Sequence, residues 1–489
     1  MYASVLSVAL VGGDVRPVRV EAHVGGTTNS FKLSGLPDTA LREAKDRVRA
    51  AIHSSGIEFP HRELTINLAP ADLKKRGSDY DLPIAISILA ADRQIRRVPR
   101  VVIAGELSLD GKVRRGGSSL GAAVMSARLG IPCLVSREHA AEVALVPGSE
   151  VHPIETLADA VALLSEGMGR TPLQPEPPVA EDQVLPDMAD VRGQAVAKRA
   201  LEIAAAGGHH ILFHGPPGGG KTMLARRLPG ILPLLDDTAS IEAALIRANA
   251  GLGDVISPIP PFRAPHHTAT RAALVGGGTG IPTPGEISLA HRGVLFLDEL
   301  AEFPRSHLDA LRQPLEEGRV LISRQGASLE FPASFQLIGA TNPCPCGYWG
   351  DPRKPCRCPE SARQRYRQRI SGPMLDRFDL AVHVKRVDGD EYRSVGGETT
   401  EVILKRVLAA RVAQTARGAL NRDLSDRDLT VLPMSNTASA LLVRSLESGA
   451  ITARGAVRVR RVAQTLADLE NSSVDDDHVA EALSLRGSW

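Results

Sequence analysis

The segment Gly215–Thr222 has the residue types and spacing of a phosphate-binding loop. An apolar run, 211–213, precedes it as a strand would, and 223–228 can continue from it as a helix. Glycines let backbone N–H groups face phosphate oxygens, Lys221 would reach the outer phosphates, and the Thr222 hydroxyl would ligate Mg²⁺. We therefore expect ATP, with Mg²⁺, to bind at eight residues: Gly215, Pro216, Pro217, Gly218, Gly219, Gly220, Lys221 and Thr222.

Two further apolar runs end in polar side chains that would complete ATP hydrolysis. The run 293–297 ends at Asp298, which would hold the Mg²⁺ shell, and Glu299, which would polarise the attacking water. Taken alone, this pattern fits a buried strand with a polar turn equally well, but the upstream phosphate loop favours catalysis. The run 335–341 ends at Asn342, which either bonds the γ-phosphate or the water, or simply forms a turn.

The composition fits a globular protein of several domains. The chain has 489 residues, 43% of them hydrophobic, and a net charge of +2, so any basic surface must be local. It contains no apolar run of about 18 residues, so we expect no transmembrane helix and, by default, a cytoplasmic protein. Four of the five cysteines crowd into 344–358, which favours a metal site over disulfides.

The chain divides at a proline-rich stretch into a mixed α/β part and an ATPase part. Within the first part we expect a hairpin around 12–14, a helix from Asp38 to about His53, strands at 64–68 and 101–106, and a buried helix at 83–91. After the prolines, strands and helices alternate as in a parallel sheet, and the last segment is expected to be all-helical. The predicted divisions are 1–170, the linker 171–186, 187–390 and 391–489.

Motifs beyond the phosphate loop resemble a known family. Residues 190–485 resemble AAA+ ATPases of the magnesium-chelatase/MCM branch, and the whole chain resembles the ComM/YifB family. The matching stretches are Val191–Gln194, Pro265–His267, Gly276–Gly278, Pro284–Gly293 and Leu375–Asp379. The resemblance implies a Lon-protease-like α+β N-terminal domain, an AAA+ P-loop core with a parallel sheet, and a small C-terminal all-α lid. Gly219 stands where this family often has Thr, a change that a loop binding through backbone N–H groups should tolerate.

The family also implies a ring, expected to be a hexamer, with ATP at the subunit interfaces. By this resemblance Arg377 would reach a neighbour's ATP, and Arg454 would be a second sensor arginine in the lid. Alternatively, Arg377 forms a surface salt bridge with Asp376, and Arg454 is an ordinary exposed helical arginine. The alternating arginines between 363 and 369 are rival candidates for the role of Arg377.

The N-terminal part raises an alternative function, an ATP-dependent peptidase. Its segments 68–83 and 105–113 resemble the Lon-protease domain, whose chemistry needs a Ser nucleophile and a Lys. The nucleophile position falls near Asp79, with Ser78 one residue away, and the helix expected to supply the Lys, 116–124, contains none. We therefore expect a non-catalytic domain that is structural or contacts DNA.

The cysteine cluster is a candidate zinc site. Four thiolates, from Cys344, Cys346, Cys356 and Cys358, could bind Zn²⁺ tetrahedrally, although pairs separated by one residue are less common than pairs separated by two. The alternative is four reduced thiols on a loop. The pair His266–His267 is a weaker metal candidate, and a structural or pore-loop role is preferred for it.

The family resemblance implies DNA as the substrate, through branch migration or helicase activity during recombination of incoming DNA. The segment 321–331 is expected to form a hairpin with Arg324 near its tip, and in related rings such a hairpin faces the pore. Repeated around a ring, Arg324 would follow phosphates without reading sequence, while a solvated hairpin tip is the simpler alternative. A motor that remodels a protein or drives metal insertion is the second function considered.

Overall fold

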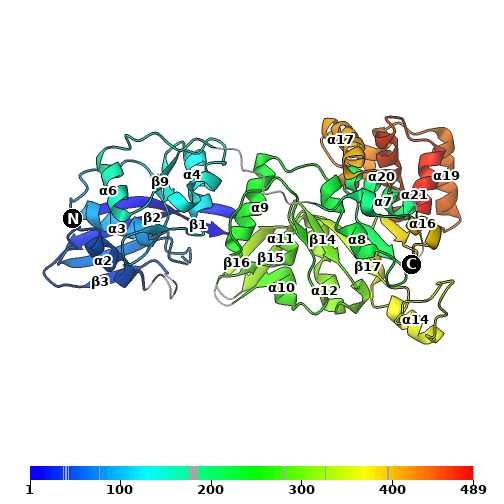
Figure 1. The fold of residues 1–489 in the computed structure, drawn as a ribbon, viewed down its shortest axis with the longest axis horizontal. Helices are drawn as coiled ribbons and strands as arrows, with labels where there is room; N and C mark the ends of the chain where they lie inside the picture. The colour runs from blue at the N-terminus through cyan, green and yellow to red at the C-terminus, as the bar shows by residue number, and fades with distance from the viewer. Residues whose placement is uncertain are drawn as a thin grey trace.

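The computed structural model describes residues 1–36, 38, 41, 43–75, 77–175, 185–278, 281–324, 327–393 and 396–487. Most of the predicted linker therefore lies outside the described residues. In Figure 1 the blue and cyan N-terminal part, the green ATPase part and the orange and red C-terminal helices follow one another along the long axis. No helix among the described residues is long and apolar enough to cross a membrane.

The N-terminal part is built on a mixed seven-stranded sheet. Its centre is the hairpin of β1 (Tyr2–Val11) and β2 (Asp14–Gly25), paired from Tyr2–His23 to Val11–Asp14 as the sequence predicts. The strand order is β3-β4-β2-β1-β5-β8-β9, in which β1–β2 and β2–β4 are antiparallel and the other pairs parallel. The remaining strands are β3 (Phe31–Ser34), β4 (Glu63–Ala69), β5 (Val102–Ile103), β8 (Cys133–Ser136) and β9 (Val151–Ile154).

Helix α3 (Asp81–Ala91) packs on β1 and β2 and is apolar on nearly all sides, as expected of a buried helix. The predicted strand at 101–106 is instead two short strands, β5 and β6 (Glu106–Leu107), and β6 leaves the sheet to pair with β7 (Val113–Arg114). Of the helix expected from Asp38 to about His53, the structure describes α2 from Ala44 on, and most of the segment between Asp38 and Ala44 lies outside the described residues. Asp38 accepts a bond from Leu41 N. The helices here are α2 (Ala44–Ser54), α3, α4 (Ser119–Leu129), α5 (Arg137–Val143) and α6 (Leu157–Ser165).

The ATPase part holds a five-stranded parallel sheet, as the alternation of strands and helices predicts. The strand order is β11-β14-β17-β10-β18. The strand before the phosphate loop, β10 (Ile211–His214), therefore pairs with β17 on one side and β18 on the other. Strands β14 (Val294–Leu297) and β17 (Gln336–Thr341) are buried at every residue because helices cover both faces of the sheet. The outer strands are β11 (Phe262–Arg263) and β18 (Leu380–His383).

Helices and small hairpins surround this sheet. The hairpin predicted at 321–331 is present as β15 (Arg319–Arg324) and β16 (Ala327–Pro332). Beside it lies a second small pair, β12 (Gly276–Gly277) and β13 (Thr283–Pro284). The helical segments are η1 (Met188–Asp190), α7 (Ala195–Gly207), α8 (Lys221–Ala225), η2 (Leu228–Ile231), α9 (Asp237–Asn249), α10 (Arg271–Val275), α11 (Glu286–Leu289), η3 (Leu300–Glu302), α12 (Arg305–Ala310), α13 (Arg312–Glu317), α14 (Glu360–Arg367), α15 (Gly372–Leu375) and α16 (Gly389–Arg393).

The C-terminal segment of the described chain is helical and packs on the ATPase core. Helices α17 (Thr400–Arg417) and α20 (Ala453–Leu469) both lie against α7, and their apolar side chains join the core formed by β10, β17 and β18. The other helices are η4 (Asn421–Asp423), α18 (Asp426–Val431), α19 (Asn436–Glu447) and α21 (Asp476–Ser484).

Helix α9 of the ATPase part packs against the N-terminal sheet. Its Ala244 and Leu245 are buried in one apolar cluster with Val8 and Val15 of the β1–β2 hairpin. The amide of Asn249, at the end of α9, donates a 2.5 Å hydrogen bond to the carbonyl of Gly12. A methyl group on Gly12 would also meet the Glu330 carbonyl of β16, so the turn of the hairpin is tightly enclosed by the ATPase part.

Candidate functional site

The phosphate loop leaves the carboxyl end of β10, which lies between the central strand β17 and the edge strand β18, at the side of a parallel sheet where ligands bind. Gly215 has φ +154°, and a Cβ there would lie 2.1 Å from the Val384 carbonyl, so only glycine fits. Gly220 has φ +94° immediately before α8. The helix expected over 223–228 ends at Ala225, and after a two-residue turn the chain continues as the 3₁₀ helix η2, with Pro229 in its first turn.

Lys221 is buried and turned back onto its own loop. Its Nζ donates to the carbonyls of Gly215 (2.7 Å) and Pro216 (3.0 Å) and to Asn342 Oδ1 (3.2 Å). Burial lowers the pKa of Lys221 to about 8, although Asp298 and Glu299 favour its charged form. The structure thus brings the side chains of Lys221 and Asn342 together from the ends of two adjacent strands.

Thr222 and Asp298 also meet. The Thr222 hydroxyl donates a 2.6 Å hydrogen bond to Asp298 Oδ2, which places two oxygen ligands of the kind Mg²⁺ prefers beside the lysine. The residues present therefore fit a magnesium ion coordinated with phosphate oxygens. Glu299 follows at φ +50°, ψ +46°, a left-handed conformation uncommon outside glycine, and its side chain is 52% exposed.

His267 is a residue of this site that sequence reasoning assigned elsewhere. Its Nδ1 lies 3.2 Å from Glu299 Oε2, and its ring packs on His266 and on the edge of Phe303. The structural or pore-loop role expected for His267 therefore does not account for all of its contacts, because its ring also contacts the candidate catalytic carboxylate. The sequence feature that could have indicated this contact is the position of His267 shortly after β11, whose neighbour β14 ends at Leu297, directly before Asp298 and Glu299.

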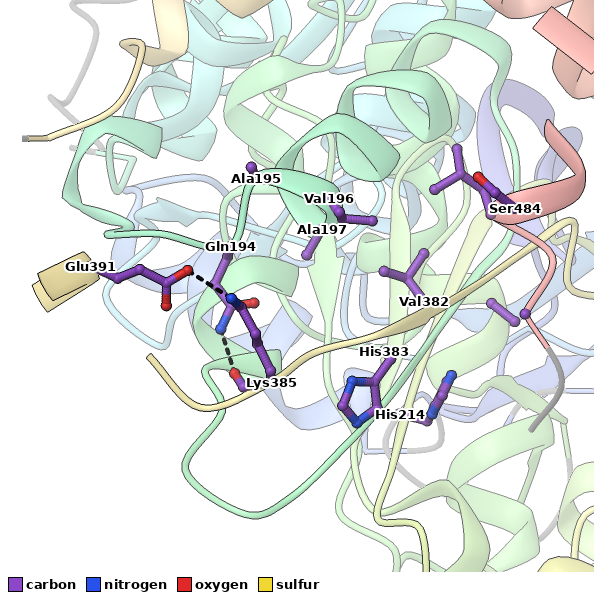
Figure 2. A pocket seen from close by; sticks show the side chains of 13 residues that line it. Gln194, Ala195, Val196, Ala197, His214, Val382, His383, Lys385, Glu391 and Ser484 are labelled. Carbon is purple, nitrogen blue, oxygen red and sulfur yellow. Dashed lines mark hydrogen bonds and ion pairs between the residues drawn. The ribbon is translucent and has the colours of Figure 1, made fainter. Parts of the chain in front are cut away.

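A cavity of about 530 Å³ lies beside the phosphate loop. Figure 2 shows His214 and His383 at one end of it, and Gln194, Lys385 and Glu391 at another. Gln194 Nε2 donates to the carbonyls of Gly219 (3.0 Å) and Lys385 (2.6 Å), so it ties the phosphate loop to the segment after β18. Burial, with the neighbouring His383, lowers the pKa of His214 to about 4, which keeps this imidazole neutral at pH 7.

Comparisons with known proteins match this architecture along the chain. Family models described as magnesium chelatase, subunit ChlI, match residues 20–138 and 187–392, and a model of the ChlI C-terminal part matches 397–486. The protein YifB of Salmonella typhimurium is 41% identical over 491 residues, covering 98% of this chain and 96% of that protein. The competence protein ComM of Haemophilus influenzae is 41% identical over 500 residues, covering 99% and 97%. The chain belongs to the ComM/YifB family of magnesium-chelatase-like AAA+ proteins. It is accordingly an ATPase motor.

In this ComM/YifB chain the two arginines expected to sense ATP lie away from its own phosphate loop. Arg377, at the end of α15, pairs with Glu316 of α13 and donates to the Pro373 carbonyl (2.7 Å), rather than pairing with Asp376. It lines a separate cavity of about 510 Å³ together with three more arginines, Arg422, Arg458 and Arg461. Arg454 is exposed on the first turn of α20. The rival arginines lie on or just after α14, where Arg369 pairs with Glu302 (2.6 Å).

The four clustered cysteines converge although their loop has little regular structure. The Sγ atom of Cys344 lies 3.4 Å from that of Cys346 and 3.6 Å from that of Cys356, and all four sulfur atoms lie within 4.8 Å of one another. A tetrahedral zinc with Zn–S bonds of about 2.3 Å needs sulfur atoms about 3.8 Å apart, so the donor set fits zinc. His266 and His267 belong to no such group among the described residues.

The N-terminal domain lacks a serine–lysine pair at the position the Lon resemblance indicates. Lon protease 2 of Bacillus subtilis is 26% identical over 243 residues, covering 45% of this chain and 40% of that protein. Asp79 is buried and accepts a 2.8 Å bond from Ser118; burial raises its pKa to about 6. Ser78 donates to Glu106, and within the described residues neither serine bonds a lysine.

The pore-facing candidate Arg324 is at the last position of β15, paired with Ala327 in the hairpin. Its side chain lies outside the described part of the structure. The hairpin carrying it is placed between the two halves of the chain, because its strand β16 contacts the β1–β2 turn.

Proposed function

We propose that this chain is the subunit of a ring that uses ATP hydrolysis to remodel DNA, through branch migration or helicase activity. The observation that carries the proposal is the convergence of Lys221, Thr222, Asp298 and Asn342 at the carboxyl ends of the parallel strands. Near-full-length similarity to a competence protein supports DNA as the substrate.

The nucleotide would span the phosphate loop and the cavity beside it. The triphosphate would replace the carbonyl partners of Lys221, and Thr222 and Asp298 would hold Mg²⁺, which neutralises charge on the phosphates. The base would enter the cavity lined by Gln194 and His214, whose neutral ring and apolar neighbours Val196 and Val382 suit an uncharged heterocycle. Glu299 would accept a proton from the attacking water, and Asn342 would orient that water or the γ-phosphate.

Assembly into a ring, expected to be a hexamer, would supply Arg377 to a neighbour's ATP. The cavity that Arg377 lines holds three further arginines, Arg422, Arg458 and Arg461, against three carboxylates, Glu316, Asp379 and Asp423, which leaves a small excess of positive charge around Arg377. The C-terminal helices would form the lid that carries Arg454 as a second sensor.

A structural Zn²⁺ held by the four clustered cysteines would fix the loop that follows Asn342. Cys344 is buried two residues after Asn342. A Cβ on Gly347 would lie 2.7 Å from the Pro217 ring, so the cysteine loop packs directly on the phosphate loop. Zinc supplies a cross-link here and takes no part in hydrolysis.

Peptidase activity is disfavoured because the position expected for the nucleophile falls near Asp79, which is bonded to Ser118, and neither Ser118 nor Ser78 bonds a lysine among the described residues. Arg324 remains the pore candidate for DNA. The deciding experiment measures ATP hydrolysis and strand exchange on synthetic three- and four-stranded junctions, with Mg²⁺ at low salt. We expect DNA to stimulate hydrolysis and the junctions to migrate. A wild-type protein that hydrolyses ATP without any response to DNA would sink the proposal.

A further inference from the structure

The cysteine loop and α14 together form a surface with unusual charge, residues 348–369, called here the basic–aromatic surface. It holds seven basic and two acidic residues, a net charge of +5 in a chain whose total is +2. Both acidic residues are already engaged, Asp351 by Arg386 and Glu360 by Arg363. Within the described residues no salt bridge occupies five of the basic side chains, since only Arg363 and Arg369 are paired: these five are Arg353, Lys354, Arg357, Arg365 and Arg367.

Of the three aromatic rings in this segment, Tyr366 is buried, whereas Trp349 and Tyr348 reach the surface among these charges. Trp349 is 41% exposed, a high value for the largest apolar side chain. The Arg367 guanidinium lies 4.1 Å from its ring centroid and that of Arg363 lies 5.6 Å away. Tyr348 is flanked in the same way by Lys354 at 4.0 Å and Arg386 at 5.3 Å. The cations hold both rings in place without covering Trp349 from solvent.

We propose that the basic–aromatic surface binds single-stranded nucleic acid, with Trp349 as a platform on which a base stacks. Free arginine and lysine side chains contact the phosphates, and an exposed indole stacks on any base, which together give binding without sequence preference. This inference rests on the proposed DNA function but names a site outside the pore, formed by basic and aromatic side chains that the proposed function does not otherwise use. In Figure 1, α14 stands out from the core on the side away from the N-terminal domain.

The alternative ligand for these cations is the ATP of a second copy of this chain. A triphosphate needs positive charge but not an exposed indole, and the arginines nearest Trp349 are turned onto its ring. The position of α14 beyond the cysteine loop, which itself covers the phosphate loop, places the surface on the outside of the nucleotide site. The observations therefore favour nucleic acid.

The chain offers a direct optical test because it has only two tryptophans, Trp349 and Trp489. In the full chain carrying Trp489→Phe, all tryptophan fluorescence comes from Trp349. Titration with a dye-free oligo-dT of about 20 nucleotides, without ATP, should quench this emission as bases stack. Raising the salt concentration should reverse the quenching, since binding releases counterions.

A parallel titration by anisotropy of labelled oligo-dT separates failure of this inference from failure of the DNA function. Binding with quenching supports the site. Binding without quenching places DNA elsewhere and overturns the inference alone. No binding overturns both, and quenching by ATP in place of oligo-dT assigns the surface to a neighbour's nucleotide.

Substitutions give an independent readout. Trp349→Ala should weaken oligo-dT binding about ten-fold, as loss of one stacked base implies. Arg365→Ala should reduce the slope of log affinity against log salt by about 0.7, the value for one single-strand phosphate contact. The matched control is Tyr392→Ala, which removes an exposed aromatic ring stacked by Arg192 on another surface and should leave the affinity unchanged. Unaltered zinc content and Tm in Trp349→Ala show an intact module, and unchanged affinity in that folded variant overturns the inference.

Discussion

The imidazole of His267 lies 3.2 Å from the carboxylate of Glu299, measured from Nδ1 to Oε2. Glu299 is the residue expected to activate water, and its backbone already occupies a left-handed conformation that non-glycine residues rarely adopt. The pair links the segment after β11 to the segment after β14, so movement of the segment after β11 would change where the Glu299 carboxylate points.

His267→Ala should therefore raise ATP hydrolysis in the absence of DNA, because it frees Glu299 to face the attacking water. The pair is half-exposed and worth at most about 1 kcal/mol, which corresponds to about a five-fold change in kcat. KM for ATP should stay unchanged, since His267 has no contact with the phosphate loop among the described residues. Steady-state kinetics with and without DNA check this, with His266→Ala as the neighbouring control. A lower kcat in His267→Ala would show instead that the histidine holds Glu299 in its active position.

Nucleotide affinity should fall as pH rises above about 8. Burial lowers the pKa of Lys221 to about 8 in the nucleotide-free protein, and bound phosphates would raise it again. ATP therefore binds the protonated lysine more tightly and takes up a proton, so Kd increases by up to about ten-fold per pH unit in this window. Titrations with ADP and ATP between pH 7 and 9.5 measure it. Lys221→Arg, which stays charged throughout, should give a flat profile whatever its absolute affinity; a sloping profile there would assign the effect to another group.

The proximity of side chains that follow parallel strands could be predicted from the sequence. Asp298 and Asn342 each follow an apolar run directly, Lys221 and Thr222 end the loop after a third run, and parallel strands bring such ends to one edge of a sheet. Contacts that depend on how loops pack could not be predicted. Gln194 donates to the carbonyls of Gly219 and Lys385 only because α7 starts beside the end of β18. No local sequence pattern predicts that these two elements lie next to each other.

In the fold, too, the elements that follow from local sequence could be predicted, and those that depend on non-local packing could not. The β1–β2 hairpin and the parallel sheet follow from alternation and apolar runs, which local sequence contains. The strand expected at 101–106 divides because the chain turns away after Ile103 to pair β6 with β7. The packing of α9 on the N-terminal hairpin is equally non-local, since its Leu245 resembles any core residue of an amphipathic helix.

Purified protein should contain about one zinc per chain, and its removal should weaken ADP binding. The cysteine loop packs on Pro217 through Gly347, so loss of the cross-link loosens one wall of the phosphate loop. Metal analysis after purification without added metal, followed by ADP titration before and after chelation, measures both effects. Cys346→Ser should lower the zinc content, whereas Cys133→Ala, at the buried fifth cysteine in the N-terminal domain, should not. Folded protein with almost no zinc would reject the site.

Asp254→Ala should weaken the junction between the N-terminal and ATPase parts. Asp254 is 2% exposed and accepts bonds from Arg115 (2.7 Å) and His139 (2.7 Å) of the N-terminal domain. Although burial opposes ionisation, these two partners hold its pKa below the ordinary value, so its stabilisation is present at neutral pH and lost as pH falls through that lowered pKa. Its removal should cost about 2 kcal/mol in the free energy of unfolding at pH 7. Denaturant titration checks this, and Glu142→Ala, a more exposed partner of Arg115, should cost less than about 0.5 kcal/mol. Equal losses in the two variants would contradict the role of Asp254.

Two inactive variants should restore activity when mixed, if Arg377 completes a neighbour's site. Glu299→Gln lacks the base and Arg377→Ala lacks the arginine, so each protein alone should bind ATP and hydrolyse it at least about 100-fold more slowly. In randomly mixed rings about a quarter of the interfaces join an intact Glu299 to an intact Arg377, and hydrolysis should return in that proportion. Size-exclusion chromatography with ATP confirms that both variants assemble. Mixed rings that remain inactive would mean that Arg377 serves its own chain, where its contact with Glu316 would make it a brace for α13 instead of a group that touches ATP.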